Sequence, residues 1–231
     1  MISYCNSCHI KIQQPNQLLC QECFESLPFI INRCNLCGIN TDTPIEICGN
    51  CQRQKPIIDK AFSIFSFQPP ISQFIHQYKQ GSTHLQHFFK PLLLSSYLHH
   101  FEHLAVDGVA AVPSNAYKTL HRGFVPALPF AQYFESSLGI TDYSSCLHKK
   151  LFSFHQKNKN RIRRLSSDPF WVSDFNKASK AGHQQHPPKH ILLLDDVITT
   201  GASINQLAKH LKKQGVKKVF ALSVAHTPRY L

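Results

Sequence analysis

The sequence lacks the features that would place it in a membrane or on a secretory route. Its 231 residues contain no apolar run close to the roughly 20 residues that span a bilayer. The N-terminal stretch MISYCNSCHIKIQQ is polar and carries cysteines where a signal peptide would carry its apolar segment. We therefore expect a cytoplasmic protein that does not insert into membranes.

Acidic residues are also scarce. The chain has 13 Asp and Glu against 25 Lys and Arg, a formal net charge of +12. The first 57 residues hold four basic and four acidic side chains, so the whole excess belongs to residues 58–231. A basic body indicates an anionic partner, either a phosphate-bearing small molecule or a nucleic acid. Ordinary solubility charge is the alternative.

Cysteine, by contrast, is concentrated near the N-terminus, in four CxxC pairs with similar spacing between pairs. Two thiolates in one tight turn point at a common centre, and two such turns form a tetrahedral S4 site that suits zinc. The spacing predicts two successive zinc ribbons, and a cross-braced pairing is the alternative. A disulfide framework fits poorly without signs of secretion. The predicted ligands of two structural zinc ions are Cys5, Cys8, Cys20, Cys23, Cys34, Cys37, Cys48 and Cys51.

The rest of the chain alternates strand and helix patterns. Strands are indicated within 57–68, 106–112, 191–194 and 216–228, and helical spacing within 71–101 on both sides of Gly81, within 124–140 and within 202–213. This order predicts an α/β fold, a mostly parallel sheet with helices on both faces. The non-alternating run ILLL is typical of a central strand. We expect two domains, a double zinc-ribbon module over 1–56 and an α/β domain over 57–231.

The stretch ILLLDDVITTGAS, residues 191–203, carries the strongest functional signal. Asp195 and Asp196 follow the apolar run at the carboxyl end of a strand, where ligands bind in open parallel sheets. The loop from Val197 enters a helix whose free N–H groups attract anions, and Gly201 permits close backbone approach to a phosphate. Further donors are the hydroxyls of Thr199, Thr200 and Ser203. A sugar phosphate fits both halves, because the acids accept from sugar hydroxyls or hold Mg²⁺.

This stretch resembles the binding motif for phosphoribosyl pyrophosphate (PRPP) in type I phosphoribosyltransferases. The resemblance implies that the two acids face the ribose hydroxyls, that the loop wraps the 5′-phosphate, and that Mg²⁺ accompanies PRPP. The loop after the preceding parallel strand, at Pro113-Ser114, is implied to cradle pyrophosphate. The implied PRPP-binding residues are Asp195, Asp196, Val197, Thr199, Thr200, Gly201, Ala202, Ser203, Pro113 and Ser114.

Cysteine knuckles ahead of such a domain resemble the ComF family of competence proteins, the ComFC/GntX group. Further resemblances to that family are Tyr78-Lys79-Gln80-Gly81, the Val112-Pro113-Ser114 and Leu120–Phe124 pair, and a basic hood segment that includes Lys149-Lys150 and Gln156. The sequence departs from the family pattern at Val125, Ser153 and Ser167.

These resemblances imply roles for single residues. If transfer occurs, the residues expected to carry it are Asp195, Asp196, Arg122 and Lys79. Lys79, Arg122 and the hood lysines would face pyrophosphate, although a surface charge is the alternative for Arg122 and a solvated basic loop for the hood. The candidates for the hood or for nucleic acid are Lys149, Lys150, Gln156, Lys157, Arg161 and Arg164.

Three hypotheses follow. The first is a PRPP-binding protein or phosphoribosyltransferase. The second is a protein of natural transformation that handles single-stranded DNA, since aromatic residues such as Trp171 accompany the basic tract. The third is an interaction module on a catalytically silent scaffold, in which the zinc ribbons dock a competence helicase or another DNA-processing protein.

Overall fold

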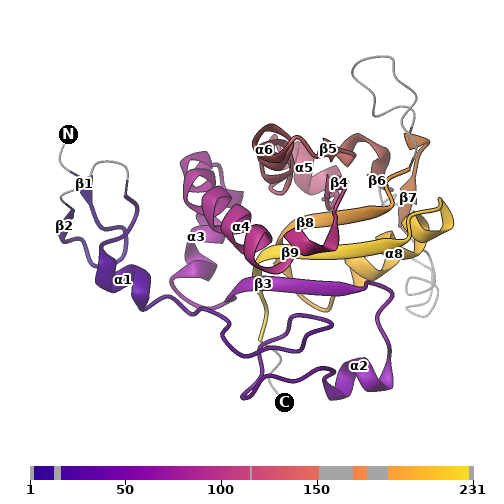
Figure 1. The fold of residues 1–231 in the computed structure, drawn as a ribbon. Coiled ribbons are helices and arrows are strands. Elements are labelled where there is room, and N and C mark those ends of the chain that lie inside the picture. The colour runs from indigo at the N-terminus through magenta and orange to yellow at the C-terminus, as the bar shows by residue number, and fades with distance from the viewer. Residues whose placement is uncertain (1–2, 13–16, 115, 151–168, 176–186, 229–231) are drawn as a thin grey trace, which may run out of the picture.

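The computed structural model describes residues 3–12, 17–114, 116–150, 169–175 and 187–228. Its centre is a sheet of five parallel strands in the order β3-β9-β8-β4-β5 (Figure 1). The strands are β3 (Lys60–Ser66), β9 (Lys218–His226), β8 (His190–Ile198), β4 (Gly108–Ala111) and β5 (Thr141–Asp142). The predicted α/β fold with a parallel sheet is confirmed.

Helices cover both faces of this sheet (Figure 1). One face packs against α3 (Ile71–Lys79), α4 (Gln86–His100) and α6 (Leu128–Leu138), and the other packs against α8 (Ala202–Lys213). The 3-10 helices η1 (Thr83–Leu85) and η2 (Glu102–Leu104) flank α4. Gly81 separates α3 from η1, as the sequence indicated, and has a positive φ of 111°.

Strand β8 is central and is longer than predicted. Its residues Ile191–Leu194 have no exposed surface, as expected of a strand covered on both faces. The strand does not end at Leu194 but continues to Ile198, because β9 runs beside it as far as the pair Ile198–His226. Asp195 and Asp196 are therefore followed by two more strand residues, and the loop that was predicted to start at Val197 starts after Ile198.

Strand β3 lies at one edge of the sheet, yet it is covered on both sides. The alternating pattern predicted a half-buried strand, but Ser63 is also buried, where its hydroxyl lies 2.7 Å from that of Ser223. On the outer edge, Ile64 O accepts from Ile30 N and Ala61 N donates to Leu36 O. The chain from Ile30 to Leu36, which leads into the second cysteine group, thus forms hydrogen bonds with the outer edge of β3.

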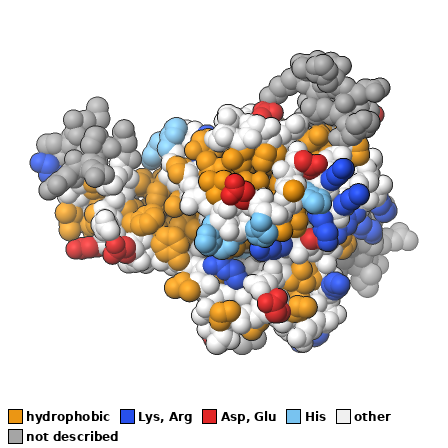
Figure 2. All heavy atoms as spheres, viewed as in Figure 1, with side chains coloured by type: hydrophobic (Ala, Val, Ile, Leu, Met, Phe, Trp, Pro, Cys, Tyr) orange, Lys and Arg blue, Asp and Glu red, His pale blue; other side chains and the backbone are white. Residues whose placement is uncertain are grey.

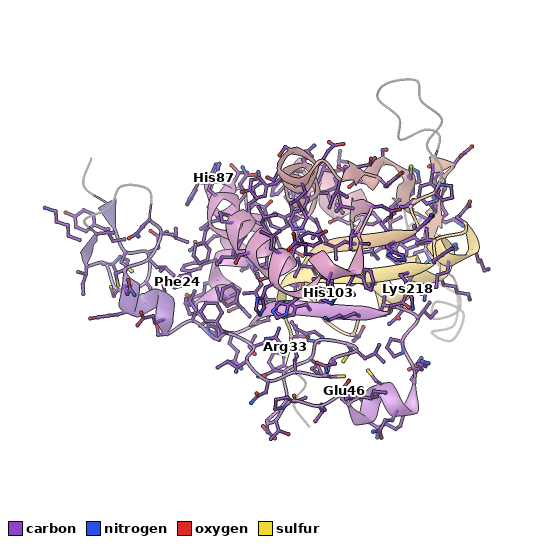
Figure 3. All side chains as sticks on the ribbon, in the orientation of Figure 1. Phe24, Arg33, Glu46, His87, His103 and Lys218 are labelled. Atoms are coloured by element: carbon purple, nitrogen blue, oxygen red, sulfur yellow. The ribbon has the colours of Figure 1, made fainter. Side chains whose placement is uncertain are left out.

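The two cysteine segments occupy different places. The first contains the hairpin β1 (Ser3–Tyr4) and β2 (Lys11–Ile12) and the short helix α1 (Gln21–Glu25), and it projects from the body in Figure 1. Phe24 points from α1 toward α4 (Figure 3), with its ring 6.3 Å from that of Phe88.

The second cysteine segment contains α2 (Gly49–Arg53) and lies against β3. Gly38, with φ at +73°, approaches so closely that a Cβ there would lie 2.8 Å from Ala61 O. Arg33 lies between this segment and the sheet (Figure 3), with Cζ 3.9 Å from the centre of the Phe62 ring. A domain boundary after residue 56 stays a prediction.

Several short elements were not predicted. Helix α5 (Ala116–Arg122) follows β4, and η3 (Ser144–Cys146) leads into β6 (Leu147–Lys149). Strand β6 pairs antiparallel with β7 (Phe170–Val172), forming a separate two-stranded ribbon beside α8. Across the part of the chain that the structure describes, no helix combines the length and the apolar character needed to cross a bilayer.

Candidate functional site

The two acids lie where β8 extends beyond its neighbour β4. The pairing of β4 with β8 ends at Ala111 and Leu194, and Val112 N then donates to Leu194 O over 2.9 Å. Beyond that point, among the described residues, Asp195 and Asp196 have a strand neighbour on the β9 side alone. The two acids therefore have no paired strand on their β4 side among the described residues, at the carboxyl edge of the sheet.

Asp196 is the buried member of the pair, with 7% of its surface exposed. Its Oδ1 accepts from the backbone N–H of Val197 over 2.8 Å, and Lys79 Nζ lies 2.7 Å from Oδ2. Among the described residues no donor meets Oδ2 in hydrogen-bonding geometry, so the charge of Lys79 is its compensation. A buried carboxylate oxygen of this kind fits a sugar hydroxyl or Mg²⁺.

Asp195 has an unusual titration. Withdrawal from water, and then the negative charge of Asp196 beside it, raise the pKa of the Asp195 carboxyl well above its ordinary value. Its Oδ1 accepts from the backbone N–H of Asp196 over 2.8 Å. The ligand-free Asp195 therefore binds its proton more tightly than a free carboxyl group does, and a bound cation would favour its ionisation.

Tyr78 connects the segment 78–81 to the segment 120–124. Its hydroxyl donates to Pro126 O over 2.8 Å, and its ring lies 5.4 Å from that of Phe124. Burial, and then the charge of Asp196, raise the pKa of the Tyr78 phenol. Lys79 and the loop after Arg122 are thus held near the same end of the sheet by one buried side chain.

Arg122 and Pro113-Ser114 lie on segments that follow β4. Pro113 and Ser114 are half-buried and leave β4 directly beyond its pairing with β8. Arg122 ends α5, is half-buried, and makes no ion pair within the described ranges. It is followed by Gly123, which has a φ of +79°.

The loop after β8 has the form of an anion site. Thr199 and Thr200 are exposed, and Gly201 precedes α8 with a positive φ of 71°, a conformation that glycine adopts without strain. Thr200 Oγ1 accepts from Ala202 N over 3.3 Å. The predicted residues Val197 to Ser203 thus form the end of β8, the turn and the first turn of α8, and the N-terminus of a helix is a position that favours anions.

Asn205 joins this loop to Ile57, the residue directly after the predicted cysteine module, and the sequence did not indicate this role. Its Nδ2 donates to Gly201 O over 3.1 Å, while its Oδ1 accepts from Ile57 N over 2.7 Å. A cavity of about 550 Å³ lies alongside, bounded by α2, the following residues 54–58 and the start of α8. The one signal in the sequence is an Asn one helical turn after the glycine.

The cysteines form two separate groups, as the sequential pairing predicted. The groups are Cys5, Cys8, Cys20, Cys23 and Cys34, Cys37, Cys48, Cys51, each with all sulfurs within 4.8 Å of one another. The Sγ atoms of Cys8 and Cys20 are 3.6 Å apart, and those of Cys37 and Cys48 are 3.7 Å apart. Tetrahedral zinc with bonds of about 2.3 Å requires about 3.8 Å between sulfurs. Each group can hold one zinc ion.

The structure describes only two of the predicted hood residues, Lys149 and Lys150. Lys149 lies in β6 with Nζ 4.8 Å from the centre of the Phe170 ring, and Lys150 is exposed directly after that strand. The other hood candidates, Gln156, Lys157, Arg161 and Arg164, lie outside the described residues. Cys146 is buried in the core, consistent with a packing role.

The amino-acid sequence of the chain is similar to those of several named proteins. No protein-family model matches the chain. It is 25% identical over 215 residues to Competence protein F of Haemophilus influenzae, covering 87% of this chain and 85% of that protein. It is 23% identical over 223 residues to the DNA utilization protein YhgH of Escherichia coli, covering 93% of each. It is 31% identical over 166 residues to Competence protein ComFC of Streptococcus pneumoniae, covering 70% of this chain and 66% of that protein.

Proposed function

The chain belongs to the ComF family of competence proteins, and from this premise we propose that it handles incoming single-stranded DNA in natural transformation and binds PRPP with Mg²⁺. The relatives' names support a role in DNA uptake and use. PRPP binding is supported by the arrangement of Asp196, Lys79 and the loop 197–203 at one edge of the sheet.

The observation that carries the PRPP proposal is the buried carboxylate of Asp196 beside an anion-binding loop. Two acids next to such a loop match a ligand that has hydroxyls near one end and a phosphate at the other. The ribose hydroxyls, or Mg²⁺ bound with PRPP, would take Asp195 and Asp196, and the loop 199–203 would take the 5′-phosphate. Lys79, which pairs with Asp196 in the ligand-free protein, would then form an ion pair with the pyrophosphate instead.

If the site also catalyses transfer, its residues act mainly through charge and position. The bond from ribose C1 to pyrophosphate breaks as a bond from C1 to a nucleophilic acceptor forms, and pyrophosphate leaves with the electron pair. Mg²⁺ supplies charge for the leaving group when bound. Lys79 and Arg122 would add cations, while Pro113-Ser114 would hold the pyrophosphate in place.

Calorimetric titration of PRPP into zinc-loaded protein, with and without Mg²⁺, tests the binding proposal. We expect saturable binding that the double variant Asp195→Asn/Asp196→Asn loses and that Asp42→Asn, at an exposed carboxylate in the second cysteine segment, retains. Absence of binding by folded wild-type protein would leave the motif as inherited scaffold. Pyrophosphate release with nucleobases or DNA as acceptors then tests turnover.

A second candidate function concerns the first cysteine segment. It projects from the body (Figure 1) and has no net positive charge. The apolar side chains of Tyr4 and Ile10 on it are 58% and 59% exposed. We propose that this segment docks a competence helicase or another DNA-processing protein. The variant Tyr4→Ser/Ile10→Ser should lose capture of such a partner while it retains PRPP binding.

A further inference from the structure

The β6–β7 ribbon places one aromatic pair on its outer side. Leu147 and Phe170 are buried, whereas Trp171 on β7 keeps 42% of its surface exposed. His148 lies directly opposite Trp171 in the strand register, and the two rings stack with centroids 3.8 Å apart and planes 19° apart. An exposed indole held flat in this way is ready to receive a second flat ring.

The ribbon holds this pair in a fixed position. His148 Nε2 lies 3.1 Å from the hydroxyl of Ser173, and Lys150 N donates to Pro169 O over 2.7 Å. Behind the ribbon, β7 packs against α8. A preorganised aromatic surface loses little side-chain entropy when it binds, so stacking there would not be offset by ordering.

Positive charge accompanies the pair. Lys150 is exposed one residue after β6, and Lys149 is the residue between it and His148. Figure 2 shows Lys and Arg side chains gathered on the side of the molecule where β6 and β7 are labelled in Figure 1. Cations beside a stacking surface match the phosphates and bases of a single strand.

We propose that Trp171 and His148 form a base-stacking platform for single-stranded nucleic acid, with Lys150 beside it for the phosphate backbone. The proposal rests on the DNA handling proposed above and names the residues that perform it. Among the aromatic residues that accompany the basic tract, Trp171 is exposed while Phe170 is buried at 2%. Stacking accepts any base, so the platform predicts weak sequence preference.

The chain contains a single tryptophan, so its fluorescence reports on this platform directly. Zinc-loaded full-length protein is titrated with an oligothymidylate, with an abasic oligonucleotide of the same length, and with duplex DNA. We expect quenching by the single strand and much weaker quenching by the abasic strand and the duplex. Equal quenching by all three would overturn the platform, because phosphates alone would then account for it.

Variants separate the platform from DNA handling in general. Anisotropy of a labelled oligothymidylate should show that Trp171→Ala weakens binding by roughly 5- to 100-fold, as expected for one stacked base, and that Trp171→Phe retains most affinity. The matched control is Tyr117→Ala, at an aromatic side chain that is 61% exposed on α5. Thermal melting of each variant establishes folding.

The outcomes distinguish two failures. Wild-type protein that binds the strand without quenching, and a Trp171→Ala variant that binds as tightly, would overturn the platform and leave DNA handling in place. Wild-type protein that does not bind single-stranded DNA would overturn both.

Discussion

Asp195 shows, at the scale of one residue, how a group placed for binding lowers the stability of the ligand-free protein. An acid whose pKa is raised by folding binds its proton more tightly in the folded state than in the unfolded state. The free energy of unfolding therefore falls as pH rises from the ordinary carboxyl range near 4 through the raised pKa, and stays low above it. The ligand-free protein at neutral pH bears this cost.

Replacing that acid should stabilise the ligand-free protein. Asp195→Asn removes the ionisation, and one unit of pKa shift corresponds to about 1.4 kcal/mol. We expect a rise in melting temperature of about 2–4 °C per kcal/mol at pH 7 in a chain of this size, and no gain near pH 4. Differential scanning calorimetry at both pH values checks this, and a variant less stable than wild type at pH 7 would contradict it.

Lys79 should matter more for pyrophosphate than for the sugar. Lys79→Gln removes a cation 2.7 Å from Asp196 that is proposed to move to the leaving group. Loss of a charged hydrogen bond costs about 1.5–3 kcal/mol, so PRPP affinity should fall about 10- to 150-fold. Affinity for ribose 5-phosphate should change much less. Equal losses for both ligands would argue against the exchange, and Lys209→Gln, at an exposed position on α8, is the control.

At the scale of the element, α8 and its preceding loop depend on one side chain. Asn205→Ala removes the bonds to Gly201 O and to Ile57 N, leaving the loop without its link to the chain that follows the second cysteine segment. We expect several-fold weaker PRPP binding and a loss of stability of about 1–2 kcal/mol. Calorimetry and urea unfolding check both, with Gln206→Ala beside it as the control. Unchanged PRPP affinity would mean that the loop is set by Gly201 alone.

The sequence predicted elements whose signals are contiguous. ILLL, the acids and the threonine–glycine turn were visible because one strand and one loop carry them all. The pairing of Lys79 with Asp196 was not visible, because it joins a helix and a strand more than a hundred residues apart. The β6–β7 ribbon was missed because three residues are too few to show a period, and the covered edge of β3 was missed because another segment supplies the cover.

At the scale of the whole molecule, the two cysteine groups differ in the part of the fold that they support. The second lies against the edge of β3, whereas the first projects from the body. Wild-type protein should contain two zinc ions per chain by elemental analysis, and Cys48→Ser and Cys8→Ser about one each.

Loss of the second zinc should therefore be the more damaging change. Cys48→Ser frees the segment that pairs with β3, which exposes strand edge to other chains and should lower the melting temperature and promote aggregation. Cys8→Ser should change the melting of the sheet less. Light scattering during a thermal ramp compares them, and equal behaviour of the two variants would contradict this division.

The path from the second cysteine segment through Ile57 and Asn205 to Gly201 has a thermodynamic consequence. Any coupling between two binding sites is reciprocal: if zinc strengthens PRPP binding by some factor, PRPP strengthens zinc binding by the same factor. The second cysteine group would then hold zinc more tightly in a chain saturated with PRPP than in a chain without PRPP. Through this path the concentration of zinc would affect the binding of an activated sugar, and the concentration of the sugar would affect the binding of zinc.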